Sequence, residues 1–221
     1  MHAKTMNNKK ILLNNSIGIF DSGVGGLSVL REIRKQIPGH PIIYFGDQTH
    51  VPYGPRPLDE VYSLSQKITR FLLDSGAKII VVACNTASAA ALFPLREEFP
   101  AIPFVGMEPA VKPAVEKTHT GNVGVLATPA TFQGKLYSSV VERFAKNVQI
   151  YQNTCVGLVQ EIEKGNFNGP ETRRILEDAL WPMMEQKIDS VVLGCTHYPF
   201  VIPLIQEIVG PDINVIDPAP A

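Results

Sequence analysis

The chain has 221 residues, of which 45% are hydrophobic and 19% are charged, and its formal net charge is −1. This composition supports a folded core and excludes a disordered chain, and the near-neutral charge gives no basis for binding nucleic acid directly or an anionic membrane surface. No apolar run reaches the roughly 18 residues expected of a membrane span, and the length allows one large domain or two of about 100 residues.

The N-terminal segment "MHAKTMNNKKILLNNS" has too short an apolar stretch for a signal peptide, so residues 1–15 are predicted to be a polar extension. The three cysteines are Cys84, Cys155 and Cys195, and no pair has CxxC spacing. An odd count without an export signal argues against a disulfide framework or a zinc site. We therefore expect reduced thiols, no metal and a cytoplasmic protein.

Strand-like and helix-like segments alternate along the chain. Strands are predicted at 16–20, 41–46, 78–84, 102–107, 122–128, 148–153, 190–195 and 214–218, and helices at 27–37, 61–76, 86–99 and 171–187. The helix at 86–99 is expected to be interrupted or bent at Pro94. Strands of near-continuous Val and Ile, each followed by a helical segment, are typical of βαβ units, so we predict an α/β fold with parallel sheets covered on both faces.

Polar residues cluster at the ends of six of these strands. The clusters read "DSGVGG", "GDQTHVPYGPR", "CNTAS", "MEP", "TPAT" and "CTHYP" in chain order. Ligands of parallel α/β sheets bind at the carboxyl ends of the strands. The six clusters therefore predict one convergent site.

Two of the clusters contain a cysteine between a strand and a helix. At such a position, the backbone N–H groups and the helix dipole are expected to lower the pKa of the Cys84 and Cys195 thiols. Their polar neighbours can cap the helix or bind a ligand carboxylate. Cys155 has no such neighbours, and we interpret it as a buried hydrophobic residue.

Two thiols at equivalent places in two half-sequences indicate two reagents that face one substrate. A cysteine hydrolase needs only one nucleophile and one base, and disulfide exchange is less consistent with thiols that each cap their own βα unit. Inversion of a stereocentre by proton transfer, in contrast, requires a base and an acid on opposite faces of one carbon.

Three further residues are candidates for assisting the thiols: Asp21 at a strand end, His197 beside Cys195, and Glu163 in "LVQEIEKG". Each has a plainer alternative, since Asp21 could only form a turn, His197 could be a structural hydrogen bonder, and Glu163 could be solvated. The glycines of "DSGVGG" do not have the G-x-G-x-x-G spacing and no Walker lysine follows. We interpret this loop as backbone that approaches a small anion.

The motifs, in this order, resemble the glutamate racemase family of cofactor-independent amino-acid racemases. The resemblance is carried by "IGIFDSGVGGLSVL", "YFGDQTHVPYGPR", "VVACNTASAAAL", "VGMEPAVKPA", "GVLATPATF" and "VLGCTHYPF", which together span most of the chain from residue 17.

The resemblance implies a racemase that uses no pyridoxal phosphate or other cofactor, interconverts L- and D-glutamate and supplies D-glutamate for peptidoglycan. It implies that Cys84, assisted by Asp21, is the base for the D-enantiomer. Cys195, assisted by His197, would be the base for the L-enantiomer. Glu163 matches a further acidic residue of the family, with Glu161 as the other choice. The substrate contacts that the resemblance implies are Asp21, Ser22, Pro52, Tyr53, Gly54, Asn85, Thr86, Thr128, Cys195, Thr196 and His197.

The resemblance also implies two similar α/β domains with the active site between them. We place the first at 16–107 plus 209–221 and the second at 108–208, and we expect a homodimer. Family members usually continue beyond "NVIDPAPA" into a helix that closes the first domain. We therefore expect the strand at 213–217 to lack a covering helix and to expose apolar surface.

Two alternatives to glutamate racemisation remain open. The chain could act on aspartate or another dicarboxylate, although "PYG" at 52–54 and "TPAT" at 128–131 favour glutamate. It could instead be a truncated form that binds ligand or gyrase without turnover. Substrate profiling separates the first alternative, and a binding assay beside a racemisation assay separates the second.

Overall fold

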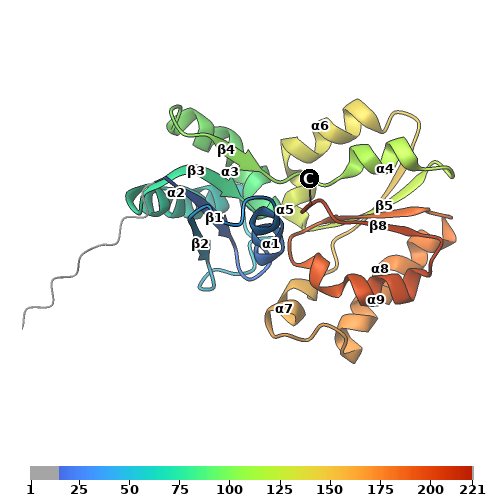
Figure 1. Cartoon of the computed structure of the whole chain (residues 1–221). Helices are drawn as coiled ribbons and strands as arrows, with labels where there is room; N and C mark the ends of the chain where they lie inside the picture. Colours follow the sequence, from blue (N-terminus) through green and yellow to red (C-terminus); the bar gives the residue numbers. More distant parts are fainter. Residues whose placement is uncertain (1–14, 221) are drawn as a thin grey trace, which may run out of the picture.

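Two four-stranded sheets organise residues 15–220, the part of the chain that the computed structural model describes. Each sheet is flanked by helices and forms one lobe of the molecule (Figure 1). All strand pairings are parallel, which confirms the predicted α/β class. Except for Asn15, the predicted polar extension at 1–15 lies outside the described residues.

The first lobe has the strand order β2-β1-β3-β4. Its β1 is central, and Ile19 lies opposite Tyr44 on one side and Val81 on the other. Strands and helices alternate strictly along the chain. The elements are β1 (Ser16–Asp21), α1 (Leu27–Gln36), β2 (Ile42–Gly46), α2 (Leu58–Asp74), β3 (Ala77–Val82), α3 (Asn85–Glu98) and β4 (Phe104–Gly106).

The second lobe repeats this topology with the order β6-β5-β7-β8. Thus β5 takes the place of β1, and β7 takes the place of β3. The elements are α4 (Val111–Lys117), β5 (Asn122–Ala127), α5 (Pro129–Gln133), α6 (Lys135–Phe144), β6 (Gln149–Asn153), α7 (Leu158–Glu163), α8 (Pro170–Glu185), β7 (Ser190–Gly194), the 3-10 helix η1 (Tyr198–Val201), α9 (Ile202–Val209) and β8 (Asn214–Ile216).

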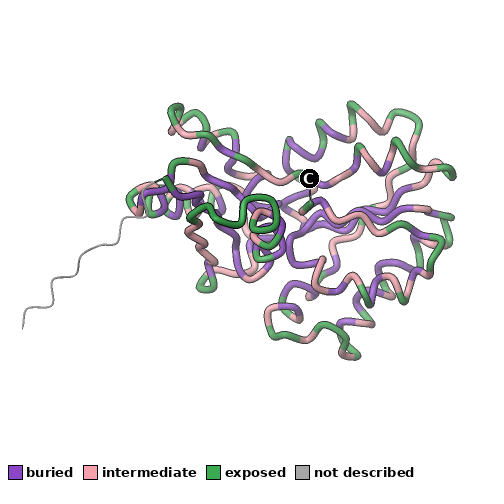
Figure 2. The backbone as a smooth tube through the Cα atoms, in the orientation of Figure 1, coloured by how far each residue is buried: buried purple, intermediate pink, exposed green. Residues whose placement is uncertain are grey.

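Apolar side chains from both faces of each sheet form the cores. The central strands β1, β3, β5 and β7 consist mostly of buried residues (Figure 2). Leu72 and Leu95 pack from α2 and α3 against one face of the first sheet, while Val29 packs from α1 against the other. In the second lobe, α7, α8 and α9 cover one face, and α4 and α6 cover the other. Burial on both faces explains the near-continuous apolar strands.

The described structure differs from two helix predictions. Helix α3 continues through Pro94 to Glu98 and is not interrupted there, because buried Leu92 and Leu95 on either side of the proline hold it against the core. Helices α4, α5, α6, α7 and α9 do not match any of the four predicted helix ranges. Helix α5 is only five residues long, and a segment that short has too few residues to establish a period.

The C-terminal strand corrects the predicted domain division. Strand β8 pairs with β7, so residues 214–216 belong to the second sheet and not to the first domain. The strand is also not left uncovered, since Val215 and Ile216 pack against the core clusters on opposite faces of the second sheet. Only beyond β8 does the chain turn back, where Ala219 packs against the core cluster of the first lobe that contains Val29.

Candidate active site

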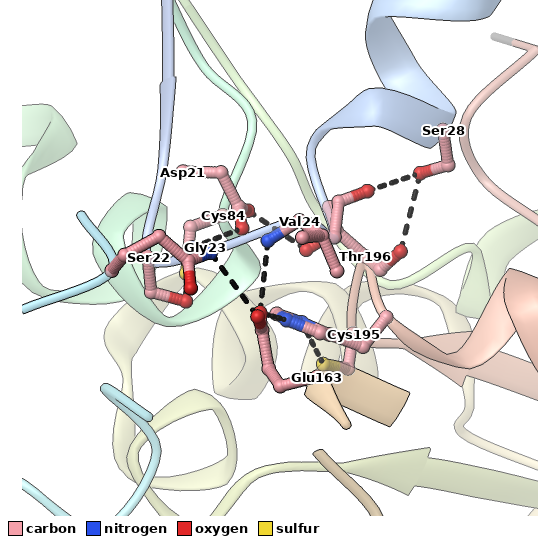
Figure 3. A network of polar contacts seen from close by, with 12 residues as sticks. Asp21, Ser22, Gly23, Val24, Ser28, Cys84, Glu163, Cys195 and Thr196 are labelled. Atoms are coloured by element: carbon pink, nitrogen blue, oxygen red, sulfur yellow. Dashed lines mark hydrogen bonds and ion pairs between the residues drawn. The ribbon is translucent and has the colours of Figure 1, made fainter. Parts of the chain in front are cut away.

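The carboxyl ends of the central strands bring the predicted residues together between the lobes. Asp21 is the last residue of β1, and Cys84 is the N-cap of α3, directly beyond β3. Cys195 follows β7 at the equivalent place in the second sheet. The Thr196 hydroxyl of the second lobe donates to Asp21 Oδ2 of the first at 2.8 Å, so the two strand-end clusters form one site (Figure 3).

Cys84 is almost fully buried, and its sulfur has two polar neighbours. The Ala87 N–H donates to Sγ at 3.4 Å, as expected at a helix N-terminus, and Sγ lies 3.9 Å from Ser22 Oγ. Burial, helped by the nearby Asp21 carboxyl, nevertheless raises the pKa of the Cys84 thiol to about 12. The predicted lowering is therefore wrong for Cys84, because one helix N–H does not offset its desolvation. Cys195 is among the groups that raise this pKa, which places the second sulfur within electrostatic reach of the first.

Cys195 has an imidazole partner instead. Its Sγ lies 3.8 Å from Nδ1 of His197, and Nε2 of His197 lies 2.5 Å from Oε1 of Glu163. Burial alone would lower the pKa of His197, but its contacts with Cys195 and Glu163 and the nearby Asp21 raise it to about 10. A charged His197 can donate to both neighbours and can balance a thiolate at Cys195.

Glu163, and not Glu161, is the acidic residue that faces the site. In addition to His197, its carboxylate accepts from the Val24 N–H at 2.8 Å and from Gln48 Nε2 at 3.1 Å. Burial would raise its pKa, but these three hydrogen bonds lower it. Glu161 is instead occupied at the surface by Lys164 and Asn166.

Asp21 is fully buried and links the glycine loop to the second lobe. Its Oδ1 accepts from the Gly23 N–H at 2.9 Å, and its Oδ2 accepts from Thr196. Burial raises its pKa, and the nearby His197 only partly offsets that effect. Asp21 is thus more than a turn residue.

A group of hydroxyls faces the site from the start of α3 and α5. Thr86 Oγ1 lies 2.7 Å from Thr128 Oγ1, which lies 2.9 Å from Thr131 Oγ1. Thr131 is a buried member that sequence reasoning missed, although the pattern "TPAT" places it three residues after Thr128 and hence on the same side of a helical turn. Asn85, beside Thr86, is buried, and neither its Nδ2 nor its Oδ1 has a hydrogen-bond partner among the described residues. Such an amide is available to a ligand.

The loop after β2 supplies the remaining predicted contacts. Pro52 and Gly54 line a pocket of about 90 Å³ together with Thr128. Tyr53 is buried, and its hydroxyl donates to Asp47 at 2.6 Å, so its phenol is already occupied and only its backbone is available to a substrate. Gly54 lies against Thr128 so closely that an added Cβ would be 2.7 Å from Thr128 Cβ.

Cys155 also lines the pocket that Pro52, Gly54 and Thr128 form, but its thiol is not part of the hydrogen-bonded groups around Cys84 and Cys195. It is buried in the second core, and burial raises the pKa of its thiol to about 12. These features agree with its interpretation as a buried hydrophobic residue. Within residues 15–220, no group of three or more His, Cys, Asp or Glu side chains is arranged to hold a metal ion. The described helices also include none that is long and apolar enough to cross a membrane.

The chain is similar in sequence to known racemases. Residues 17–221 match the family described as Asp/Glu/Hydantoin racemase. The chain is 50% identical over 205 residues to a glutamate racemase of Roseiflexus sp. (strain RS-1), a match that covers 93% of this chain and 75% of the relative.

Solved structures agree with this match. The Escherichia coli glutamate racemase, in complex with L-glutamate and the activator UDP-MurNAc-ala, has a TM-score of 0.85 at 34% identity and covers 94% of this chain and 79% of its own. The Francisella tularensis glutamate racemase, in complex with D-glutamate, has a TM-score of 0.81 at 34% identity over 95% and 78% of the two chains. The chain belongs to the Asp/Glu/hydantoin racemase family.

Proposed function

We propose that this protein interconverts L- and D-glutamate by a two-base proton transfer in which Cys84 and Cys195 act on opposite faces of Cα. The observation that carries the proposal is the pair of cysteines at equivalent strand ends of two topologically matching sheets, each beside its own ionisable partner. Glutamate is favoured as the substrate because solved relatives hold L- or D-glutamate. The D-glutamate formed would supply peptidoglycan synthesis.

In the direction from L to D, the Cys195 thiolate takes the proton from Cα, and His197 and Glu163 balance the charge. The Cys84 thiol delivers its proton to the opposite face of the same carbon. The cycle leaves a thiol at Cys195 and a thiolate at Cys84, which is the state that accepts D-glutamate. Proton exchange with solvent, or turnover in the reverse direction, restores the first state.

The other groups hold the substrate in this geometry. The free amide of Asn85 and the hydroxyls of Thr86 and Thr128 suit a carboxylate, and Asp21 suits the ammonium group. Ser22, Thr196 and the backbone at Pro52, Tyr53 and Gly54 complete the proposed contacts. Such fixed positioning supplies much of the rate enhancement in proton transfer.

The test is proton NMR of the purified protein with each glutamate enantiomer in deuterated water, without added pyridoxal phosphate. We expect loss of the Cα proton signal from both enantiomers and decay of the optical rotation. If a folded sample exchanges the Cα proton of neither enantiomer, the proposal is wrong. Faster turnover of aspartate than of glutamate would reassign the substrate, and the predicted homodimer is checked on the same sample by sedimentation.

Variants of the two cysteines test the mechanism itself. Cys84→Ser and Cys195→Ser should each abolish racemisation in both directions, because each turnover uses both groups and a serine hydroxyl is not appreciably ionised at neutral pH. Each variant should still eliminate the leaving group from one enantiomer of a β-substituted analogue, since elimination needs only one base. A variant that racemises in one direction only would contradict the two-base cycle.

A further inference from the structure

Tyr44 of β2 contacts the loop that separates the two proposed proton-handling carboxylates. Its side chain is partly buried, and its hydroxyl donates to the carbonyl oxygen of Gly23 at 2.7 Å. Burial, together with the nearby Asp21, Cys84 and Glu163, raises the pKa of Tyr44 well above its ordinary value. The hydroxyl therefore remains a donor throughout the neutral range.

The peptide that Tyr44 holds is the one that reaches Glu163. The carbonyl of Gly23 and the N–H of Val24 belong to a single planar group and point in opposite directions. When Tyr44 fixes the carbonyl oxygen, it also fixes the direction of the N–H, which donates to Glu163 Oε1 at 2.8 Å. The preceding N–H, that of Gly23, donates to Asp21. Figure 3 shows the backbone of Gly23 and Val24 between these two carboxylates.

Glu163 lies directly against this peptide. A Cβ added to Gly23 would overlap Glu163 Oε1, at 1.9 Å, so the carboxylate occupies the space that only a glycine leaves open. The same oxygen, Oε1, lies 2.5 Å from Nε2 of His197, whose Nδ1 faces Cys195. A shift of the Gly23–Val24 peptide is therefore transmitted through one oxygen atom to the imidazole.

We propose that Tyr44 is a positioning residue for the Cys195 half of the reaction. By holding the Gly23–Val24 peptide, it directs the Val24 N–H of the first lobe toward Glu163 of the second. Glu163 in turn orients His197 toward Cys195. The inference rests on the proposed racemisation. It assigns a role to a side chain that is not among the predicted catalytic residues or substrate contacts. It also makes the orientation of the imidazole in one lobe depend on contact with the other.

Tyr44→Phe tests this inference because it removes one hydroxyl and keeps the ring. We expect kcat/KM to fall about tenfold, in line with the loss of one buried hydrogen bond. The fall must be equal in both directions, since the equilibrium constant between the enantiomers is 1. The primary deuterium isotope effects on kcat/KM distinguish the two halves. Slower transfer at Cys195 makes proton removal from L-glutamate more rate-limiting, so the effect should rise with Cα-deuterated L-glutamate and fall with the D-enantiomer.

Two further variants keep the outcome decisive. Tyr62→Phe is the control, because it removes a hydroxyl of α2 that donates to Glu98 at the end of α3, and it should leave both isotope effects unchanged. In a protein that already carries Glu163→Gln, adding Tyr44→Phe should lower kcat/KM little further, because Tyr44 acts through Glu163. Additive losses, or isotope effects that move together, would overturn the inference. If the wild-type protein does not racemise glutamate, the proposed function fails; if it does and Tyr44→Phe equals wild type, only this inference fails.

Discussion

The two proposed catalytic thiols have opposite electrostatic surroundings although their places in the fold match. Cys84 lies near the Asp21 carboxyl. Burial raises the pKa of its thiol to about 12, so the thiol stays protonated at neutral pH. Cys195 faces His197, which carries a positive charge at neutral pH because its pKa is about 10. One residue type can therefore serve as a proton donor on one side of the substrate and as a charge-balanced base on the other.

Gly25 illustrates how tightly the glycine loop fits against the second lobe. A Cβ at this position would lie 2.5 Å from His197 Nδ1 and 2.6 Å from Thr196 Oγ1. The added methyl group should push the imidazole, whose other nitrogen Glu163 holds, away from Cys195. We therefore expect Gly25→Ala to lower kcat/KM by on the order of 100-fold. Gly39→Ala is the matched control, because its Cβ meets no described atom within 4 Å. Equal activity of the two variants would contradict this account.

The raised pKa of His197 predicts how stability depends on pH. The ordinary pKa of 6.5 rises to about 10 in the folded protein, where the groups that face the ring are Cys195, Glu163 and Asp21. The folded state therefore binds the proton more tightly than the unfolded state does, and the resulting stabilisation is complete below pH 6.5 and is lost as the pH rises through about 10. Urea unfolding of wild type and His197→Asn should show a steeper fall in wild type over this window. Parallel curves would mean that His197 is neutral in the folded state.

At the level of elements, the strands and their polar ends could be predicted because parallel strands buried on both faces are almost purely apolar. The change from Val and Ile to Asp, Cys or Thr then marks the point where each strand ends. For the same reason, the sequence indicates that Asp21 and Cys84 share the carboxyl edge of one sheet and that Cys195 lies at the equivalent edge of the other. The placement within each sheet needed only the period of the strands and the rule for parallel sheets, whereas the contact between the two edges, such as that of Thr196 with Asp21, depends on how the lobes pack.

Other features depend on contacts that no local pattern contains. The sheet that β8 joins is decided by its register, in which Val191 lies opposite Val215, and a three-residue strand has no signature of its own for this choice. Glu163 and Glu161 are separated by one half-turn of α7, so only the position of the first lobe decides which of them meets His197. The pKa of Cys84 likewise depends on how far the surrounding fold buries it.

The turn between α4 and β5 lies at the end of the second sheet that is opposite the site, and Asp189 stabilises it there. The Asp189 carboxylate, directly before β7, accepts from the Thr118 hydroxyl and from the N–H groups of His119 and Thr120, all within 2.9 Å. Although partial burial opposes the effect, these bonds lower the pKa of Asp189. Its contribution to stability is therefore present above the ordinary pKa of 3.8 and is lost as the pH falls through the lower folded value.

Asp189→Asn should therefore separate stability from activity. At neutral pH, we expect the free energy of unfolding to fall by about 1–2 kcal/mol, because the amide is a weaker acceptor for the three donors. Racemisation should stay unchanged, since Asp189 precedes β7 while Cys195 follows it. Urea unfolding and initial rates at 25 °C measure the two quantities. A loss of kcat without loss of stability would be inconsistent with a purely structural role.

At the scale of the whole molecule, the site is complete only while the lobes touch. Thr196 reaches Asp21, and Glu163 reaches Val24 and Gln48, so each lobe completes the proton-handling groups of the other. The segment after β8 adds a further link, because Ala219 packs against the first core. A substrate that enters between the lobes must break these contacts. When the contacts form again, the two lobes enclose the substrate.

Ser28 offers a test of this coupling from outside the proposed substrate contacts. Its hydroxyl shares one proton between the Gly25 carbonyl at 2.8 Å and the Thr196 carbonyl of the other lobe at 3.2 Å. Ser28→Ala should weaken the closed arrangement by about 0.5–1 kcal/mol and raise KM roughly threefold with little change in kcat, because a smaller fraction of the protein is then competent to bind. Ser75→Ala removes a comparable hydroxyl contact within α2 and its cap, and should leave KM unchanged. If Ser28→Ala lowers kcat and leaves KM at the wild-type value, the serine orients the reacting groups and does not stabilise the contact between the lobes.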